Sequence, residues 1–324
     1  MELFKPQEFS FSSIRTFDVW GRQNLVRIDN LCNLSDPVEL YPSEELRAVC
    51  RKILEARAHN RPVIVFYGAH VIKCGLSRYW IDLIKRGLIT HVASNGAGSI
   101  HDFELAYLGG TSEYVPTAIE DGSFGMWEQT GGWINEAIQQ GFDKGYGYGE
   151  SLAHYVDENP DRFPYRGDCV FYAAYSHGVP ATYHTTMGTD IIHEHPSVDF
   201  AAIGGTSGRD FKIFVNSLKD LEGGVFLNIG SSVTGPEVFL KALSIVRNCG
   251  YPTRCITTGN FDIIPLGDYK SDVSKEHFHY YYRPRKNIIN RPVSQGGNGY
   301  YICGNHMQTV PTLYHLLTDC QKDL

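Results

Sequence analysis

The sequence has no uninterrupted apolar stretch of membrane-spanning length and no excess of basic residues. Its Lys and Arg number 29 against 36 Asp and Glu, which gives a formal net charge of −7. Nucleic-acid binding depends on clustered Lys and Arg, and a membrane helix needs about 20 consecutive apolar residues. We therefore expect neither a nucleic-acid partner nor a membrane partner.

Paired cysteines are also missing. The eight cysteines are scattered, and no CxxC pair occurs among them. Residues 1–11, MELFKPQEFSF, do not show a basic region followed by an apolar run, which is the pattern of a secretion signal. These features are typical of a reduced, cytoplasmic protein.

Neither of two common phosphate-binding signatures, GxGxxG and GxxxxGK[ST], occurs in the chain. Four runs of small residues follow apolar segments instead. They are Gly68–His70, Asn95–Gly98, Gly204–Gly208 and Gly230–Ser232. A tight turn would explain any one of them. Several at successive strand ends would share one edge of a sheet, where backbone N–H groups can meet a dinucleotide.

Short apolar runs alternate with stretches of helical periodicity. We expect strands near residues 62–67, 88–93, 180–184, 224–229 and 254–258, and helices near 44–60, 77–86, 127–140, 168–176, 211–221 and 237–247. This alternation is typical of a doubly wound, Rossmann-like parallel α/β sheet. The predicted organisation is one domain over residues 61–324, with a helical N-terminal extension, residues 1–60, packed on it.

An acidic stretch follows the second run of small residues. Asp102 and Glu104 stand close behind Gly98, with His101 beside them. A carboxylate there could bind a ribose hydroxyl or a substrate ammonium. Acidic residues in the first turn of a helix also interact favourably with its dipole, so both interpretations stay open.

Residues 184–195 contain three histidines and two acids, namely His184, His193, His195, Asp190 and Glu194. Such side chains can bind a metal. However, the two later histidines have strand spacing, whereas the two acids suit a helix, so no shared geometry follows. We expect no metal site, and we interpret Gly188, Thr189 and Asp190 as a ligand-binding loop.

Three further residues could act on an amine. Lys286 lies in a basic stretch, and a desolvated lysine can form an imine with a carbonyl. Asp262 and Glu237 are candidates for holding a cationic substrate. A solvated loop for the lysine, and a helix cap or surface position for the acids, are the alternatives.

Several segments resemble the deoxyhypusine synthase family, specifically its bacterial branch. The likeness extends from Pro62 to the C-terminus. It rests on FYGAHVIKCGLS, THVASNGAGSIHDFELA, VFYAAYSHGVPATYHTTMGTDIIHEHP, GGVFLNIGSSVTGPEVFLKALSIVRNCG and TTGNFDIIPL.

The resemblance implies a Rossmann-like, NAD-dependent homotetramer, a dimer of dimers. It would transfer a 4-aminobutyl group from spermidine or a related polyamine, through an imine on Lys286, to a protein lysine or a small amine. The implied cofactor-binding residues are Gly68, Ala69, His70, Asn95, Gly96, Ala97, Gly98, Asp102, Gly188, Thr189, Thr258 and Gly259. The expected substrate-binding residues are Asp262, Glu237, His184 and Asp190.

The chain departs from the family pattern near the amine pocket. Pro284 stands where the family has a tryptophan, and the segment beginning at Glu237 lacks the family's His and Asn. Two alternatives to aminobutyl transfer therefore remain. One is an NAD-assisted lyase or deaminase of an ornithine-like basic amino acid. The other is a catalytically degenerate NAD-binding oligomer.

Overall fold

A computed structural model describes residues 5–271 and 273–320. Its centre is a six-stranded sheet in which all neighbouring strands run parallel. In spatial order the strands are β5 (Ala181–His184), β3 (His91–Asn95), β2 (Val63–Tyr67), β6 (Val225–Ile229), β7 (Thr257–Asp262) and β8 (Asn298–Cys303). A separate antiparallel pair joins β1 (Asn24–Arg27) to β4 (Gly110–Glu113). The predicted Rossmann-like α/β fold is confirmed.

Eleven α-helices occur in the described part of the chain. They are α1 (Glu44–Ala58), α2 (Ala69–Lys73), α3 (Ser77–Lys85), α4 (Gly96–Leu108), α5 (Val115–Asp121), α6 (Glu128–Lys144), α7 (Tyr148–Glu158), α8 (Val170–Ser176), α9 (Phe200–Leu218), α10 (Thr234–Asn248) and α11 (His306–Cys320). Arg285–Asn290 forms a short π-helix. Within the described residues, no helix is long and apolar enough to span a membrane.

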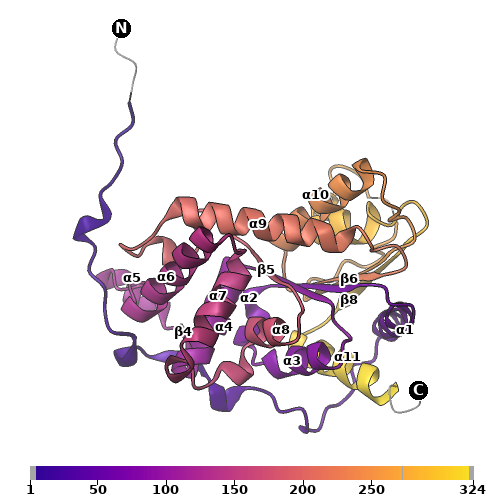
Figure 1. Ribbon diagram of the computed structural model, residues 1–324. Helices are drawn as coiled ribbons and strands as arrows, with labels where there is room; N and C mark the ends of the chain where they lie inside the picture. Colours follow the sequence, from indigo (N-terminus) through magenta and orange to yellow (C-terminus); the bar gives the residue numbers. More distant parts are fainter. Residues whose placement is uncertain (1–4, 272, 321–324) are drawn as a thin grey trace.

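Alternate residues of the central strands enter two separate cores. Val63 and Val65 of β2 belong to the core that α1, α3, α8 and α11 complete. Ile64 and Phe66 face the opposite core, with α9 and α10. Figure 1 shows α9 and α10 on one side of the sheet, and α3, α8 and α11 on the other. Every residue of β2 is buried, as expected for a parallel strand covered on both faces.

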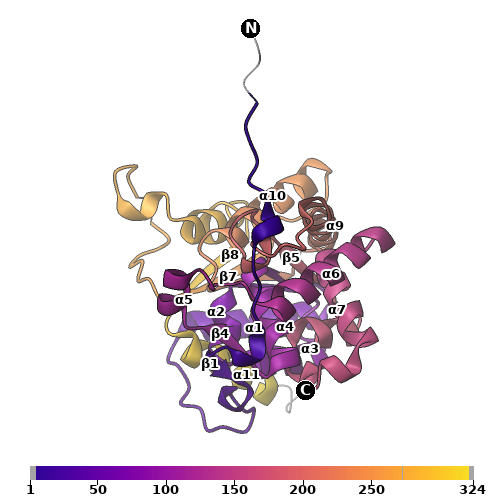
Figure 2. The same ribbon diagram turned by 90° about the vertical axis from the view of Figure 1, so that its left-hand side faces the viewer.

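A third, aromatic-rich core lies beyond β5, where α4, α6, α7 and the first half of α9 meet. The N-terminal segment runs along this part of the molecule before it reaches α1. The backbone N–H of Val19 donates to Gln129 of α6, and β1 then pairs with β4. Figure 2 shows β1, β4, α5 and α2 gathered on one side of the molecule.

The strand order reverses beside β2. The chain runs outward from β2 through β3 to β5, and it returns to the other side of β2 for β6, β7 and β8. After β2 the helix α2 packs on one face, whereas after β6 the helix α10 packs on the other. Dinucleotides bind in Rossmann-like sheets at such a reversal of strand order.

Two sequence-based expectations about elements are wrong. Gly204–Gly208 is not a turn but part of α9, where a Cβ on Gly205 would overlap the ring of Phe142 on α6. The glycine there permits close helix packing. Strand β7 also begins and ends later than expected, so Thr258 and Gly259 lie inside it and not in the turn after it.

Candidate functional site

A cavity of about 440 Å³ lies beside the carboxyl edge of the sheet, between α2, α4, the β1–β4 pair and the loop after β5. Its polar lining consists of Arg22, Lys73, His101, Glu104, Ser112, Glu113, Thr189 and Asp190. Its apolar lining includes Leu25, Ile100, Val115, Pro116, Phe124 and Ile191. The volume suits a small ligand.

Helix α4 presents one face to this cavity. Ala97, Ile100, His101 and Glu104 all line it, and their spacing places them on one side of a helix. The helix begins after Asn95, whose side-chain oxygen accepts the backbone N–H of Gly98 at 3.0 Å. Asn95 thus fixes where the helix starts, and so which residues face the cavity.

Asp190 reaches the start of α4 from the loop after β5. The backbone N–H of Ala97 donates to its carboxylate. A Cβ on Gly96 would overlap this carboxylate, so glycine is required for the approach. The predicted ligand residues Gly96, Ala97 and Asp190 are therefore neighbours in space.

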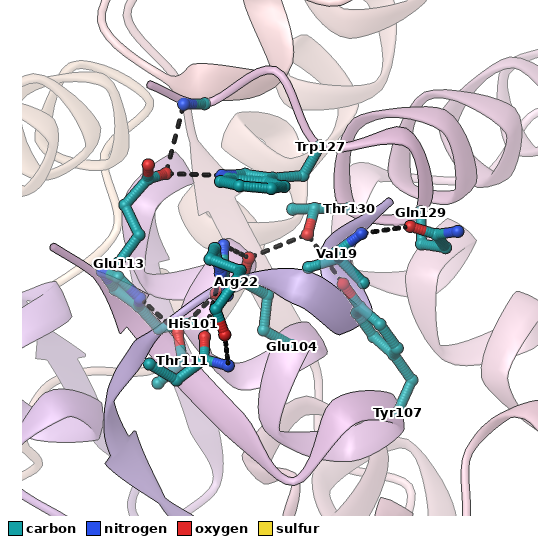
Figure 3. A network of polar contacts seen from close by, with 12 residues as sticks. Val19, Arg22, His101, Glu104, Tyr107, Thr111, Glu113, Trp127, Gln129 and Thr130 are labelled. Atoms are coloured by element: carbon teal, nitrogen blue, oxygen red, sulfur yellow. Dashed lines mark hydrogen bonds and ion pairs between the residues drawn. The ribbon is translucent and has the colours of Figure 1, made fainter. Parts of the chain in front are cut away.

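A buried ion pair between Arg22 and Glu104 also belongs to the wall of the cavity, as Figure 3 shows. Arg22 Nη1 donates to Glu104 Oε1 at 2.7 Å. The hydroxyls of Thr111 and Thr130 also donate to Glu104, at 2.5 and 2.8 Å. Every oxygen of this carboxylate is thus engaged, while Arg22 Nη2 has no hydrogen-bond partner.

Glu113 occupies the end of β4. Its Oε2 accepts the backbone N–H of Gly125 at 3.1 Å and the indole N–H of Trp127 at 2.8 Å (Figure 3). Its Oε1 is buried and has no hydrogen-bond partner. Asp190 Oδ2 is also buried and has no hydrogen-bond partner. A buried polar atom without a partner is costly, so a ligand that satisfied these atoms would gain affinity.

The lining acids differ in proton affinity. Burial raises the pKa of Asp190 to about 6 and also raises the pKa of Glu113. Burial acts the same way on Glu104, but the adjacent Arg22 guanidinium outweighs it and lowers the pKa of Glu104. Glu104 is therefore the ionised partner of Arg22, whereas a bound cation would stabilise the ionised forms of the other two acids.

The charges of the lining define a complementary ligand. Three carboxyl groups (Glu104, Glu113 and Asp190) face two cationic side chains (Arg22 and Lys73). Among the lining residues, the buried charged atoms without a hydrogen-bond partner are one cationic donor and two acidic acceptors. A ligand with one carboxylate, two ammonium groups and a net charge of +1 matches both features.

The residues predicted to bind a cofactor fall into separate places. Gly68, Ala69 and His70 follow β2 at the reversal of strand order, beside Gly230. Ala97 and Thr189 line the cavity. Thr258 is buried in β7, where its hydroxyl donates to the carbonyl of Ile288. Gly259 is packed against Leu227 in the sheet, so neither β7 residue lies in a ligand-contacting turn.

Asp102 and His184 have structural contacts instead of the expected ligand-binding roles. The carboxylate of Asp102 is buried and accepts the backbone N–H groups of Val170 and Phe171 at the start of α8, both at 3.0 Å. It is therefore unavailable to a ribose hydroxyl. The imidazole of His184 stacks on Phe66, and burial lowers its pKa to about 3, so it is a neutral core residue.

The expected amine-binding residues do not line the cavity. The ammonium of Lys286 lies 5.0 Å from the ring centroids of both Tyr280 and Tyr281. Asp262 accepts the Tyr282 hydroxyl at 2.5 Å and two backbone N–H groups. Glu237 is paired with Lys241 and Arg283. Lys286 thus lies in the π-helix, with Glu237 and Asp262 beside this segment, and none of the three lines the cavity.

The later histidines fix loops. His193 Nδ1 accepts the backbone N–H groups of Gly188 and Asp190, both at 3.2 Å, which holds the loop that carries Asp190. His195 Nδ1 lies 2.7 Å from the Ser197 hydroxyl. Over residues 5–271 and 273–320, no group of three or more His, Cys, Asp or Glu side chains is arranged to hold a metal ion.

Sequence reasoning missed the cavity residues Arg22, Lys73 and Glu113. Arg22 and Glu113 come from the β1–β4 side of the molecule, and neither stands in a recognisable motif. One usable signal existed in α4, where the spacing of Ala97, Ile100, His101 and Glu104 predicts a shared helix face.

No protein-family model matches this sequence, and a comparison with curated protein sequences finds no match. Solved structures are similar in fold. AgrE in its ternary complex with ornithine and NAD+ gives a TM-score of 0.54 at 14% identity, over 89% of this chain and 35% of AgrE. ArgZ, a cyanobacterial arginine dihydrolase from the ornithine-ammonia cycle, gives 0.52 at 12% identity, over 85% of this chain and 33% of ArgZ.

This chain thus spans about a third of the length of AgrE and ArgZ. A conserved protein from Methanococcus maripaludis assigned as LOR/SDH gives a TM-score of 0.52 at 13% identity, over 89% of this chain and 73% of that protein. A protein from Entamoeba histolytica assigned as a deoxyhypusine synthase reaches only 0.42 at 8% identity, over 80% of this chain and 76% of that protein. At these identities the likenesses establish the fold. They do not establish the expected kinship with deoxyhypusine synthases.

Proposed function

We propose that this protein is an NAD-dependent enzyme that releases ammonia from an ornithine-like basic amino acid. The observation that carries the proposal is the set of unpartnered charged atoms around the cavity, Arg22 Nη2, Glu113 Oε1 and Asp190 Oδ2. They complement the carboxylate and two ammonium groups of a diamino acid. The bound ornithine and NAD+ of AgrE support the same ligand class on a similar fold.

Different residues of the cavity would bind the different charged groups of the substrate. Arg22 would hold the substrate carboxylate, because a guanidinium pairs well with carboxylates. Glu113 and Asp190 would each hold an ammonium group. The apolar side chains, among them Ile100 and Val115, would pack against the methylene groups between these charges.

NAD would lie across the carboxyl edge at the reversal of strand order. Glycine at position 68 lets the turns after β2 and β6 meet, and the exposed side chains of His70 and Ser232 from these two turns would contact the dinucleotide. Bound there, NAD would supply the hydride acceptor that oxidation of an amine carbon requires.

The test is a series of ligands that each lack one charged group. Calorimetry in the presence of NAD would compare ornithine with putrescine, 5-aminopentanoate and norvaline, which lack the carboxylate, the α-ammonium and the side-chain ammonium. We expect each to bind about 10- to 150-fold more weakly than ornithine, the range given by loss of one charged hydrogen bond. Incubation of ornithine with NAD should yield a product lighter by one ammonia and no net NADH, because the hydride that NAD accepts would return to the substrate carbon once ammonia has left.

Equal affinity for ornithine and putrescine would contradict the assignment of Arg22 and favour a polyamine substrate instead. In that case spermidine should bind more tightly than ornithine. Lys286 provides a second distinction, because trapping with borohydride and spermidine would label it only in an aminobutyl transferase.

A further inference from the structure

The imidazole of His101 is placed in the cavity by a chain of hydrogen bonds. It lines the cavity from α4, beside Lys73 and Glu104. Its Nδ1 lies 2.7 Å from the hydroxyl oxygen of Thr111, and that hydroxyl lies 2.5 Å from Glu104 Oε2 (Figure 3). Hydrogen bonds therefore link Glu104 of the ion pair, through Thr111, to His101 at the cavity.

The protonation states of these groups fix which atom donates and which accepts in each of these hydrogen bonds. Glu104 is ionised beside Arg22, and an ionised carboxylate only accepts. The single proton of the Thr111 hydroxyl must therefore point to Glu104. The oxygen of Thr111 can then only accept from His101, so the hydrogen of the imidazole is on Nδ1.

The other ring nitrogen is consequently a base. Burial lowers the pKa of His101 to about 4, so the ring is neutral at physiological pH. A neutral imidazole with its hydrogen on Nδ1 carries a free lone pair on Nε2. Over the described residues, the contact with Thr111 is the one hydrogen bond that the imidazole of His101 makes.

We propose that His101 is a catalytic base whose Nε2 takes a proton from the substrate ammonium, and that Thr111 and Glu104 are its positioning residues. The proposal rests on the proposed function and names the group that deprotonates the substrate ammonium. In the step, the N–H bond of the ammonium breaks and an N–H bond forms at Nε2. The result is a neutral amine and an imidazolium. The freed nitrogen lone pair is what later loss of hydride from the adjacent carbon requires.

The chemistry of the lining favours this role. Oxidation of an amine at carbon cannot proceed from the protonated nitrogen, so the enzyme needs a proton acceptor within the cavity. Glu104 is paired with Arg22, and Lys73 is a cation. Glu113 and Asp190, the second with a pKa of about 6, are assigned to holding the ammonium groups, so the neutral imidazole is the remaining acceptor in the lining. Positive charge that develops on His101 would be stabilised by Glu104 through Thr111, as in other base–orienter pairs.

Two pairs of variants test the assignment. His101→Asn keeps a donor near the Nδ1 position for Thr111 but removes the base, and we expect kcat to fall by about 10²- to 10⁴-fold with little change in ornithine affinity. Thr111→Val removes the hydroxyl and should lower kcat roughly tenfold, the effect of one hydrogen bond. Thr111→Ser keeps the hydroxyl and should act like the wild type. An unchanged kcat in His101→Asn would overturn the proposal.

Nuclear magnetic resonance gives a readout independent of turnover. Nitrogen-15 shifts of labelled histidine distinguish the two neutral tautomers, and His101→Asn assigns the signal. We expect hydrogen on Nδ1 in the wild type and in Thr111→Ser, and a shift toward the other tautomer in Thr111→Val. Hydrogen on Nε2 in the wild type would refute the mechanism.

The same spectra separate failure of this inference from failure of the proposed function. If no basic amino acid is turned over, the proposed function fails. Added ornithine should still move the Nε2 signal of His101 if this nitrogen meets an ammonium in the cavity. An unchanged Nε2 signal with ornithine bound would overturn the inference even if ammonia is released.

Discussion

Replacement of Arg22 by methionine should reduce stability far more than loss of an ordinary surface ion pair. The side chains of Arg22 and Glu104 are 3% and 1% exposed, and their charged atoms lie 2.7 Å apart. Arg22→Met would leave a buried carboxylate without its counter-charge. Removal of one partner from a buried pair costs about 3–5 kcal/mol, so we expect a loss of that size in the free energy of unfolding.

The chain offers a matched control. Lys52 and Glu55 are also 2.7 Å apart, but their side chains are 37% and 57% exposed. Lys52→Met should therefore lower the free energy of unfolding by no more than about 1 kcal/mol. The double variant Arg22→Met, Glu104→Gln removes both charges and should recover part of the loss, because no unpaired charge remains.

Equilibrium unfolding in urea would measure these values, with tryptophan fluorescence and circular dichroism as separate probes. A loss below about 1 kcal/mol in Arg22→Met, equal to that of the surface control, would refute the reasoning from burial. Recovery in the double variant should appear even if ligand binding is lost, since the stability argument does not depend on the substrate.

Three other predictions concern the cavity and the core. Burial raises the pKa of Asp190 to about 6, and its carboxylate must be ionised to hold an ammonium, so the wild type should bind ornithine more weakly below pH 6. Calorimetry of Asp190→Asn should show no such decrease in affinity. An identical pH profile would contradict the role of Asp190. Burial also raises the pKa of Asp210 to about 8. The folded state then binds this proton more tightly than the unfolded state does. Relative to Asp210→Asn, wild-type stability in urea should therefore be greatest below the unfolded pKa of about 4, fall as pH rises toward 8, and level off above it. Parallel curves would refute this. Gly96→Ala should weaken ornithine binding by displacing the Asp190 carboxylate, whereas Gly132→Ala, with its nearest atom 3.6 Å from the new Cβ, should bind normally. Equal binding by both would be inconsistent with this contact.

Much of the fold was predictable because buried parallel strands have a clear sequence pattern. The apolar run 62–67 became β2, and the helical stretch near 44–60 became α1, which begins after Ser43, whose hydroxyl accepts the N–H of Leu46. The glycines of 204–208 were predicted to form a turn, but Gly205 is needed for close packing against a helix that is distant in sequence. A sequence does not show that Phe142 of α6 lies against α9.

The candidate site was less predictable, since its parts come from distant segments. Arg22 and Glu104 are 82 residues apart, and Glu113 stands on the short β4 strand. The resemblance implied a cofactor contact for Asp102, which stands close behind a glycine-rich run. On α4, Asp102 faces the start of α8, whereas His101 faces the cavity.

The position of Arg22 has a consequence for how the cavity forms during synthesis. The segment that carries Arg22 leaves the ribosome before β4 and α6 exist, yet it docks against both. Its guanidinium must stay hydrated until Glu104 has been made and α4 has folded. The polar wall therefore closes through contacts of high sequence separation, which form slowly in folding. Ligand binding should accordingly appear among the last events of refolding, after the central sheet has formed.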